Sequence, residues 1–154
     1  VLTQSMAIVE YLDETRPTEP RFMPADPAGR ARVRAIAQAI ACEIHPLNNL
    51  RVLRHLGQVF GIDEESRTRD WYRHWIAVGM QGVEGLLAGN TATGAFCHGN
   101  SPTLADICLV PQVYNAQRFD CDLGDYPTVT AISARCLELL AFRDALPENQ
   151  PDAE

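Results

Sequence analysis

The stretch EIHPLNNLRVLRHL gathers side chains that could bind a small polar ligand. Asn48 and Asn49 follow His45 by three and four residues, so on a continuous helix they would share its face and present hydrogen-bond donors. Arg51 lies just beyond them. The commoner meaning of such a pattern is a solvated polar helix face, with His45 capping a turn that Pro46 disturbs. Both interpretations stay open from the residues alone.

Two other places could bind a carboxylate. Asn115 and Arg118 are three residues apart near the end of an apolar segment. An arginine there either balances the helix dipole, for less than about 1 kcal/mol, or holds a ligand carboxylate. Gln4 and Ser5 stand where a helix begins, and Ser5 is a favourable N-cap. The free amides of a first helical turn bind carboxylates, although a plain cap is far commoner.

Several kinds of chemistry are excluded by missing residue types. All 13 basic residues are arginines. Schiff-base chemistry and P-loop phosphate binding both use a lysine, so the sequence excludes both. A bound anion must then be held by arginine, backbone amides, histidine or hydroxyl groups. His55, His74 and His98 show no metal-binding spacing with cysteines or carboxylates, so we expect no metal.

Length and composition indicate one ordinary globular domain. The 154 residues are 46% hydrophobic and 21% charged, and a net charge of -7 argues against nucleic acid as a partner. No apolar run reaches the roughly 18 residues of a membrane span, so no membrane partner is expected. The odd number of cysteines fits neither a disulfide framework nor a zinc site. Cys42, Cys108 and Cys136 have apolar neighbours, and we expect them in the core of a cytoplasmic protein.

The candidate binding residues must be positioned by helices, which the spacing of the apolar residues predicts. A short helix is expected over residues 5–14, followed by a proline-rich linker over 16–25. Asp26 and Pro27 form a strong helix start, and apolar residues then recur at helical spacing as far as residue 60. We expect one long helix there, kinked near Pro46, which has no N–H to donate.

Further helices are expected in the second half of the chain. An apolar stripe over 72–87 predicts one of them. The sequence TLAD at 103–106 predicts a capping box at the start of a central helix, which Pro111 would bend. A last helix is expected over 128–140. The predicted fold is an all-α bundle of about five or six helices, with residues 1–3 as a possible strand remnant.

Four segments of the chain carry a family resemblance, namely LTQSMAIVEYLDE, DPAGRARVRAIAQAIACEIHPLNNLRVL, SPTLADICLVPQVYNAQRF and AFRDALPENQPDA. They closely resemble the zeta-class glutathione transferases, the maleylacetoacetate and maleylpyruvate isomerases, and the similarity covers essentially the whole chain. The TLAD capping box is shared by glutathione transferases in general, whereas IHPLNNLRVL together with LVPQVYNAQRF is more specific to the zeta class. The resemblance therefore implies both a fold and an activity.

The implied fold is the C-terminal helical bundle of a glutathione transferase, preceded by part of a thioredoxin-like domain. Residues 1–15 would be the last strand end and helix of that glutathione-binding domain, 16–25 the linker and 26–154 the helical domain. The Ser-Ser-Cys loop that activates the glutathione thiol in this family does not occur in the sequence. We therefore expect this chain alone to fold its helices without turning over substrate.

The resemblance also implies roles for individual residues. Glutathione, the implied cofactor, would be bound by Gln4, Ser5, His45 and Asn49. Arg118 would be the catalytic residue that holds a substrate carboxylate, and Arg51 is a weaker substrate-binding candidate. The implied reaction is cis–trans isomerisation of maleylacetoacetate- or maleylpyruvate-like diacids, in which the glutathione thiolate adds to the double bond and leaves after rotation. The implied assembly is a homodimer.

Two other functions stay open at this stage. The chain could be a non-catalytic helical module for binding or dimerisation, or a general glutathione-conjugating transferase. An upstream in-frame thioredoxin-like segment with Ser-Ser-Cys would favour the isomerase over the module. A substrate panel would separate the isomerase from the general transferase.

Overall fold

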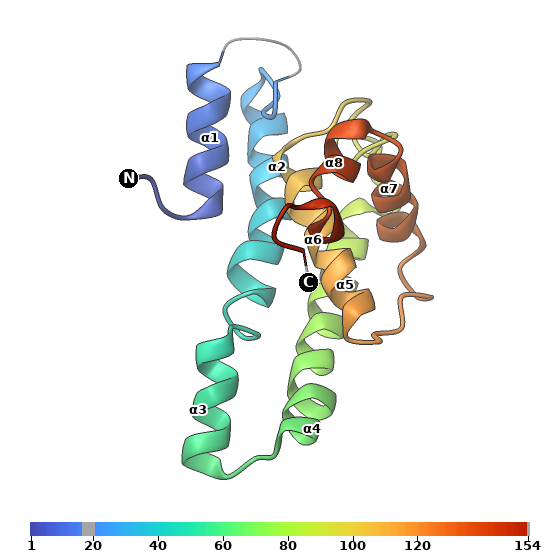
Figure 1. The fold of residues 1–154 in the computed structure, drawn as a ribbon. Helices are drawn as coiled ribbons and strands as arrows, with labels where there is room; N and C mark the ends of the chain where they lie inside the picture. The colour runs from blue at the N-terminus through green and yellow to red at the C-terminus, as the bar shows by residue number, and fades with distance from the viewer. Residues whose placement is uncertain (17–20, 154) are drawn as a thin grey trace.

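Helices account for all the regular structure in the computed structural model, which describes residues 1–16 and 21–153 (Figure 1). In chain order the elements are α1 (Ser5–Thr15), α2 (Pro27–Gln38), a first π-helical segment (Ala39–Ile44), α3 (Leu50–Phe60), α4 (Glu64–Ser66), a second π-helical segment (Arg67–Tyr72), α5 (Arg73–Leu87), α6 (Leu104–Arg118), α7 (Pro127–Leu137), α8 (Leu140–Asp144) and a 3-10 turn (Pro147–Asn149). The predicted all-α class is confirmed for these residues, and none of their helices is long and apolar enough to cross a membrane. Part of the predicted linker, 17–20, lies outside them.

Two helix starts that the sequence predicts are confirmed. The Asp26 carboxylate accepts the backbone N–H of Gly29 at 2.7 Å, and Pro27 occupies the first helical position of α2. At the start of α6, the Asp106 carboxylate accepts the backbone N–H of Thr103 at 2.8 Å, which completes the capping box. These starts depend on residues within one helical turn of each other, which is why the sequence alone predicts them.

The first residues do not form the predicted strand end. Residues 1–3 have no regular structure, because a strand end needs a neighbouring strand and the described part of the chain contains none. The sequence predicts Ser5 as the N-cap of α1, but in the structure Ser5 is the first residue of this helix. The N-cap is Gln4, which has a positive φ of 72°.

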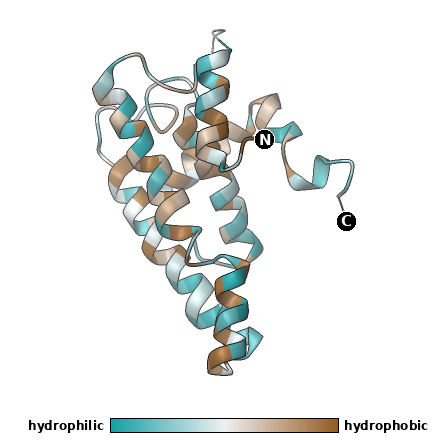
Figure 2. Cartoon of the chain, turned by 90° about the vertical axis from the view of Figure 1, so that its left-hand side faces the viewer, coloured by the Kyte–Doolittle hydropathy of each residue, from teal (hydrophilic) through white to brown (hydrophobic). Residues whose placement is uncertain are grey.

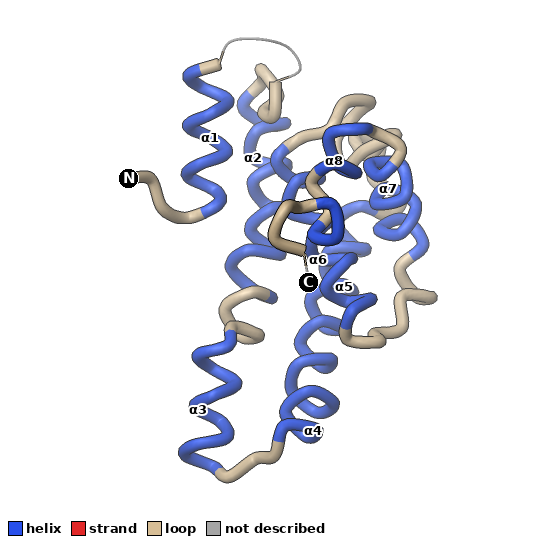
Figure 3. Tube along the Cα trace, viewed as in Figure 1, coloured by secondary structure: helices blue, strands red, loops and turns tan. Residues whose placement is uncertain are grey.

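The prediction of a single long helix as far as residue 60 is wrong. Beyond α2 the helix widens into the first π-helical segment, where the His45 N–H donates to the Ile40 carbonyl, five residues back, at 3.1 Å. Pro46 then offers no N–H that could continue either pattern. The chain turns through a loop (Figure 3), and the separate helix α3 begins at Leu50 after an extended Asn49.

The α6 helix lies at the centre of the bundle, as predicted. It packs against α2, α7 and the first π-helical segment (Figure 1), and it continues through Pro111 to Arg118. The largest fully buried apolar side chains include Ile36, Ile40, Ile44, Ile76, Met80, Leu87, Leu104 and Leu109. Figure 2 shows hydrophobic and hydrophilic residues interleaved along the long helices, as expected for helices that bury one side. The α3 helix differs, because none of its residues is buried.

Two further predictions need correction. The last long helix, α7, ends at Leu137, because Leu139 is extended with φ -82° and ψ 132° before α8 begins. Cys136 is buried as expected and Cys108 is partly buried, but Cys42 is exposed. Cys42 lies two residues from both Ile40 and Ile44, which face the core, so it points away from the core despite its apolar neighbours.

Candidate functional site

The turn over residues 45–49 brings part of the predicted ligand-binding cluster to the surface. His45 and Asn49 are exposed, but Asn48 is only 8% exposed and its Nδ2 donates to the Tyr72 carbonyl at 3.1 Å. The three side chains therefore do not share one face as predicted. The cause is the π-helical segment, which ends the helix before Asn48.

Asn49 and Arg51 lie together at the start of α3. Asn49 is the N-cap of this helix, and its Oδ1 accepts the Arg51 backbone N–H at 3.0 Å. Both side chains are exposed. The capping bond fixes the Asn49 side chain through its oxygen and leaves the two N–H donors of its amide for a ligand.

His45 lies beside Gln112 of α6. The residue as a whole is exposed, but its ring is buried enough for desolvation to lower the pKa of His45, and a hydrogen bond with the Gln112 side chain partly offsets this by raising the pKa. Gln112 is itself fully buried, and neither atom of its side-chain amide has a partner at regular hydrogen-bond geometry. The contact between the two side chains is therefore loose in this structure, and the lowered pKa of His45 favours its neutral form.

The N-terminus of α1 offers unpaired backbone donors. The first N–H that pairs within the helix is that of Ile8, which donates to the Gln4 carbonyl at 3.0 Å. The Gln4 side chain makes no capping hydrogen bond, so it leaves the amides of the first turn free of side-chain caps. A helix N-terminus with free amides and a neighbouring Ser5 hydroxyl is suited to a carboxylate.

The start of α1 and the His45 turn lie against adjacent turns of α6. The Met6 sulfur, in the first turn of α1, is 3.8 Å from the Cys108 sulfur of α6. Gln112, which faces His45, follows Cys108 by four residues, which is about 6 Å along a helix. Met6, which follows Ser5, and the His45 turn thus lie near the same short stretch of α6.

A chain of contacts connects this turn to Arg118. The Tyr72 backbone binds Asn48, and the Tyr72 ring lies 4.1 Å from the Phe119 ring, centroid to centroid. The Arg118 guanidinium carbon lies 5.9 Å from the centre of the same Phe119 ring. The Tyr72 hydroxyl and the Asn115 amide also exchange hydrogen bonds at 2.8 to 3.1 Å. Arg118 is exposed and has no carboxylate partner among the described residues, so its charge is available to an anion.

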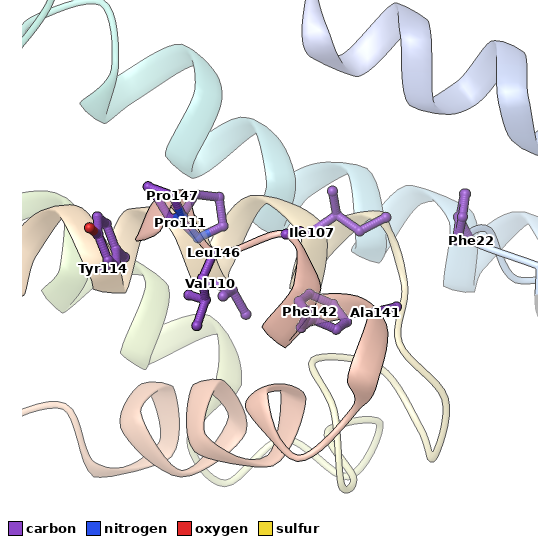
Figure 4. A pocket seen from close by; sticks show the side chains of 10 residues that line it. Phe22, Ile107, Val110, Pro111, Tyr114, Ala141, Phe142, Leu146 and Pro147 are labelled. Atoms are coloured by element: carbon purple, nitrogen blue, oxygen red, sulfur yellow. The ribbon is translucent and has the colours of Figure 1, made fainter. Parts of the chain in front are cut away.

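A separate apolar cavity of about 380 Å³ lies between α6, α8 and the 3-10 turn that follows α8 (Figure 4). Its lining is Phe22, Ile107, Val110, Pro111, Tyr114, Ala141, Phe142, Ala145, Leu146 and Pro147. The only polar side-chain group there is the Tyr114 hydroxyl, and no lining residue is charged. A dicarboxylate needs cationic or donor groups, so this cavity does not suit one.

Four of the five cysteines are disfavoured as thiolates by burial. Burial raises the pKa of Cys108 to about 11 and that of Cys136 to about 12, and the Asp106 carboxylate adds to both shifts. Burial likewise raises the pKa of Cys97 and Cys121. No group of three His, Cys, Asp or Glu residues that could hold a metal occurs in residues 1–16 and 21–153.

Comparison with known proteins places this chain in a family. A probable maleylacetoacetate isomerase of Vibrio cholerae serotype O1 is 55% identical over 152 residues, which cover 99% of this chain and 69% of that relative. A maleylpyruvate isomerase solved in its holo form, a bacterial glutathione S-transferase of the zeta class, superposes with a TM-score of 0.94 at 48% identity, over 99% of this chain and 71% of that one. The chain belongs to the zeta-class glutathione transferases.

A further similar protein was crystallised with a ligand. The maleylacetoacetate isomerase of Anaeromyxobacter dehalogenans, with GSH bound in its active site, superposes on this zeta-class chain with a TM-score of 0.91 at 44% identity, over 99% of this chain and 68% of that one. No family model matches the chain.

Sequence reasoning missed two residues that this zeta-class chain places beside the candidates. Gln112 sits in an apolar run, and its only signal is that it is polar at a position where the helix should be buried. Tyr72 was assigned only to an apolar stripe, whereas its backbone and hydroxyl bind Asn48 and Asn115. Neither role can be inferred from local spacing, because both depend on the break after Ile44.

Proposed function

We propose that this protein catalyses glutathione-dependent cis–trans isomerisation of maleylacetoacetate- or maleylpyruvate-like diacids. The observation that carries the proposal is the 55% identity to a probable maleylacetoacetate isomerase over 99% of the chain. The holo maleylpyruvate isomerase and the GSH-bound maleylacetoacetate isomerase support it.

The residues present fit glutathione, a tripeptide with two carboxylates and one ammonium group. The α1 N-terminus has free amides and no side-chain cap, as a carboxylate-binding helix end requires. His45 and Asn49 are exposed and have ring and amide groups that suit a peptide. The unpaired Gln112 amide behind His45 is a further sign that this region is completed by a ligand.

We assign the roles as follows. Ser5 and the first-turn amides of α1 hold the γ-glutamyl carboxylate, with Gln4 adding a polar contact. His45 and Asn49 bind the rest of the tripeptide. Bound glutathione supplies a thiolate that can add to the substrate double bond and so permit its rotation.

Arg118 is the residue that we assign to the substrate. An exposed guanidinium without a carboxylate partner can hold one end of a diacid and stabilise negative charge as it develops. The Phe119 ring beneath it favours the cation at this position. Arg51, exposed in the first turn of α3, is a second and weaker candidate for the same role.

We assign residues 1–15 to the end of a thioredoxin-like glutathione-binding domain, 16–25 to a linker and 26–154 to a C-terminal helical domain. A homodimer is the proposed assembly. Its support is α3, which buries no residue and exposes Leu50, Val59 and Phe60 by 57%, 58% and 66%. Exposed apolar side chains at both ends of this helix are suited to contact with a second copy. A cytoplasmic location agrees with five cysteines that form no disulfide.

The proposed function is tested with maleylacetoacetate and with maleylpyruvate, each with and without glutathione, by measuring the trans product. Because this sequence contains no Ser-Ser-Cys, activity in this test and in those of the Discussion is measured on the chain joined to a thioredoxin-like segment that contains it. We expect conversion of at least one diacid only when glutathione is present. If neither diacid is converted while a general electrophile is conjugated to glutathione, the protein is a conjugating transferase and the proposal is wrong.

A further inference from the structure

A polar pocket of about 600 Å³ lies where α2 and α6 begin. Three segments form it, namely residues 21–25, the first turn of α2 and the loop that leads into α6. Two arginines and a histidine line this pocket, Arg21, Arg30 and His98, and Asn100, Ser101 and Thr103 add hydrogen-bonding side chains. None of its described lining residues is acidic, although the protein carries a net charge of -7. Cationic and donor groups without a carboxylate among them are suited to an anion.

The pocket lies apart from the residues assigned to glutathione. The Arg21 guanidinium donates to the Asp13 carboxylate at 3.1 Å, and Asp13 is close to the end of α1. Gln4 and Ser5 lie at the start of this helix, whose 11 residues span about 16 Å. Figure 1 shows the N-terminus and the segment that leads into α2 at opposite ends of α1. Ligand binding in this pocket therefore does not depend on the proposed function.

Arg30 supplies the main positive charge of the pocket. Its guanidinium donates to the Pro24 carbonyl at a long 3.4 Å, and it forms no ion pair in the described part of the chain. Arg30 is partly buried, so solvent screens its charge less than that of a surface arginine. Arg21 differs, because the Asp13 carboxylate fixes its side chain and offsets its charge.

His98 is held beside the first turn of α2 by close packing. Its Nε2 lies 3.1 Å from the point where a Cβ on Gly29 would stand, so the ring packs directly on the backbone of this glycine. The Asp26 carboxylate also approaches this point, and it accepts the Gly29 N–H. The other ring nitrogen, Nδ1, is buried and has no hydrogen-bond partner among the described residues. Buried polar atoms nearly always have a partner, and a ligand in the pocket can supply one.

Backbone hydrogen bonds hold the walls of the pocket together. The Leu104 N–H donates to the Phe22 carbonyl at 2.9 Å, which joins the start of α6 to the segment before α2. The Gly99 N–H donates to the Ala92 carbonyl at 2.9 Å and closes the loop that contains His98. A ligand would therefore meet groups that are already in place, which lowers the entropy cost of binding.

We propose that this pocket binds the phosphate group of a small phosphorylated molecule. Arg30 and His98 donate to the phosphate oxygens from two different segments, and the Asn100 amide and the Ser101 hydroxyl belong to the same lining. A phosphate group is tetrahedral, so its oxygens can meet donors from several directions, whereas a planar carboxylate suits a single guanidinium. The pocket of about 600 Å³ is larger than a phosphate ion, and the remainder has room for an organic group.

The first test is an amide NMR titration of the protein with inorganic phosphate at constant ionic strength. We expect saturable shifts at Arg30, His98 and Ser101. Arg30→Gln should raise the Kd for phosphate about tenfold, which is the effect of losing one charge-assisted hydrogen bond. Arg143→Gln, the same change at an exposed arginine of α8, is the matched control. A Kd in Arg30→Gln equal to that of the control, or shifts that do not saturate in the wild type, would overturn the proposal.

A second variant tests the contribution of the histidine. His98→Phe keeps an aromatic ring and removes both ring nitrogens, and His74→Phe makes the same change at an exposed position of α5. We expect the Kd for phosphate to rise severalfold in His98→Phe and to stay at the wild-type value in His74→Phe. Equal Kd values for the two variants would contradict the proposal.

Glycerol 3-phosphate and acetate identify the chemical group that is bound. We expect glycerol 3-phosphate to bind at least as tightly as inorganic phosphate, and acetate to bind about tenfold more weakly because it offers fewer oxygens and less charge. Equal affinities for acetate and phosphate would contradict a phosphate site. None of these measurements needs isomerase activity, so this proposal and the proposed function fail separately.

Discussion

The buried Asp106 carboxylate accepts both the backbone N–H and the hydroxyl of Thr103, each at 2.8 Å. Its other oxygen accepts the Cys97 N–H at 2.9 Å, so one side chain connects the start of the central helix to the preceding loop. Asp106 is 0% exposed, and no water can replace these bonds when the carboxylate is removed.

Asp106→Ala should therefore lower the free energy of unfolding by about 2 kcal/mol or more, because three donors lose their acceptor. Urea unfolding followed by circular dichroism measures the change, with the exposed Asp125→Ala as control. A variant as stable as the control would mean that α6 does not depend on the capping box.

Glu84 of α5 supplies the cap that α7 lacks in its own sequence. Its carboxylate accepts the N–H groups of Thr128 and Val129 at 3.1 and 2.9 Å, while Tyr126 at the N-cap position makes no side-chain cap. Glu84→Gln should cost about 1 kcal/mol of stability, since a charged acceptor at a helix N-terminus becomes neutral. The exposed Gln81→Glu on the same helix is the control. Equal unfolding midpoints for Glu84→Gln and the wild type would rule out this cap.

Asp13 connects α1 to Arg21 and Phe22 of the linker, and it makes the stability of this contact dependent on pH. Burial alone would raise the pKa of Asp13, but hydrogen bonds from the Arg21 guanidinium and the Phe22 N–H outweigh it, so the pKa lies below its usual value. Because the folded pKa is the lower one, the stabilisation is complete above the unfolded pKa of about 3.9 and is lost as the pH falls through the folded value.

Asp13→Asn should therefore be less stable than the wild type at pH 7, and the difference should shrink as the pH falls below about 4. Urea midpoints of both proteins at a series of pH values give the comparison. A difference that stays constant down to pH 2 would show that the carboxylate charge is not what Arg21 and Phe22 bind.

Thiol labelling should distinguish the cysteines by exposure. Cys42 is exposed, whereas Cys97 and Cys136 are buried and their pKa values are raised by burial. Under native conditions at pH 8, iodoacetamide should modify Cys42 first and leave the two buried thiols unmodified. Mass spectrometry of peptides locates the label, and Cys42→Ser should remove the fast phase. Early labelling of Cys97 would contradict the burial of this residue in the loop that precedes α6.

Arg118→Ala should lower kcat/KM for the diacid by about tenfold or more while the KM for glutathione barely changes. The loss reflects one charge pair with a substrate carboxylate. Arg143→Ala, an exposed arginine of α8, is the matched control. A kcat/KM equal to the control would remove Arg118 from the site.

The parts of the fold that the sequence predicts correctly are those that depend on near neighbours in the chain. The capping box of Thr103 and Asp106 and the Asp26 cap of α2 each involve residues three positions apart. The break after Ile44 was not predicted. Pro46 indicates that a helix is disturbed, but whether the helix kinks or ends depends on how the π-helical segment packs against α6. Local pattern cannot distinguish a kink from a complete break.

The candidate site could likewise be predicted only in part. The helix start at Gln4 and Ser5 and the exposed turn with His45 could be recognised from residue types and from the family resemblance. The pairing of His45 with Gln112 could not, because the two residues are far apart in sequence and Gln112 lies in an apolar run. Asn48 was grouped with its neighbours by helical spacing, and it faces inward because that helix has ended.

The most direct test of the proposed activity uses the chain joined to a thioredoxin-like segment with Ser-Ser-Cys, and it compares glutathione with S-methylglutathione in the conversion of maleylacetoacetate and maleylpyruvate. S-methylglutathione keeps the carboxylates and amides that Ser5, His45 and Asn49 are assigned to bind, but it has no thiol. We predict that the trans product forms with glutathione and not with S-methylglutathione, which should inhibit in competition with glutathione. Equal conversion with both compounds, or none with either, would contradict the assignment of this protein as a glutathione-dependent isomerase.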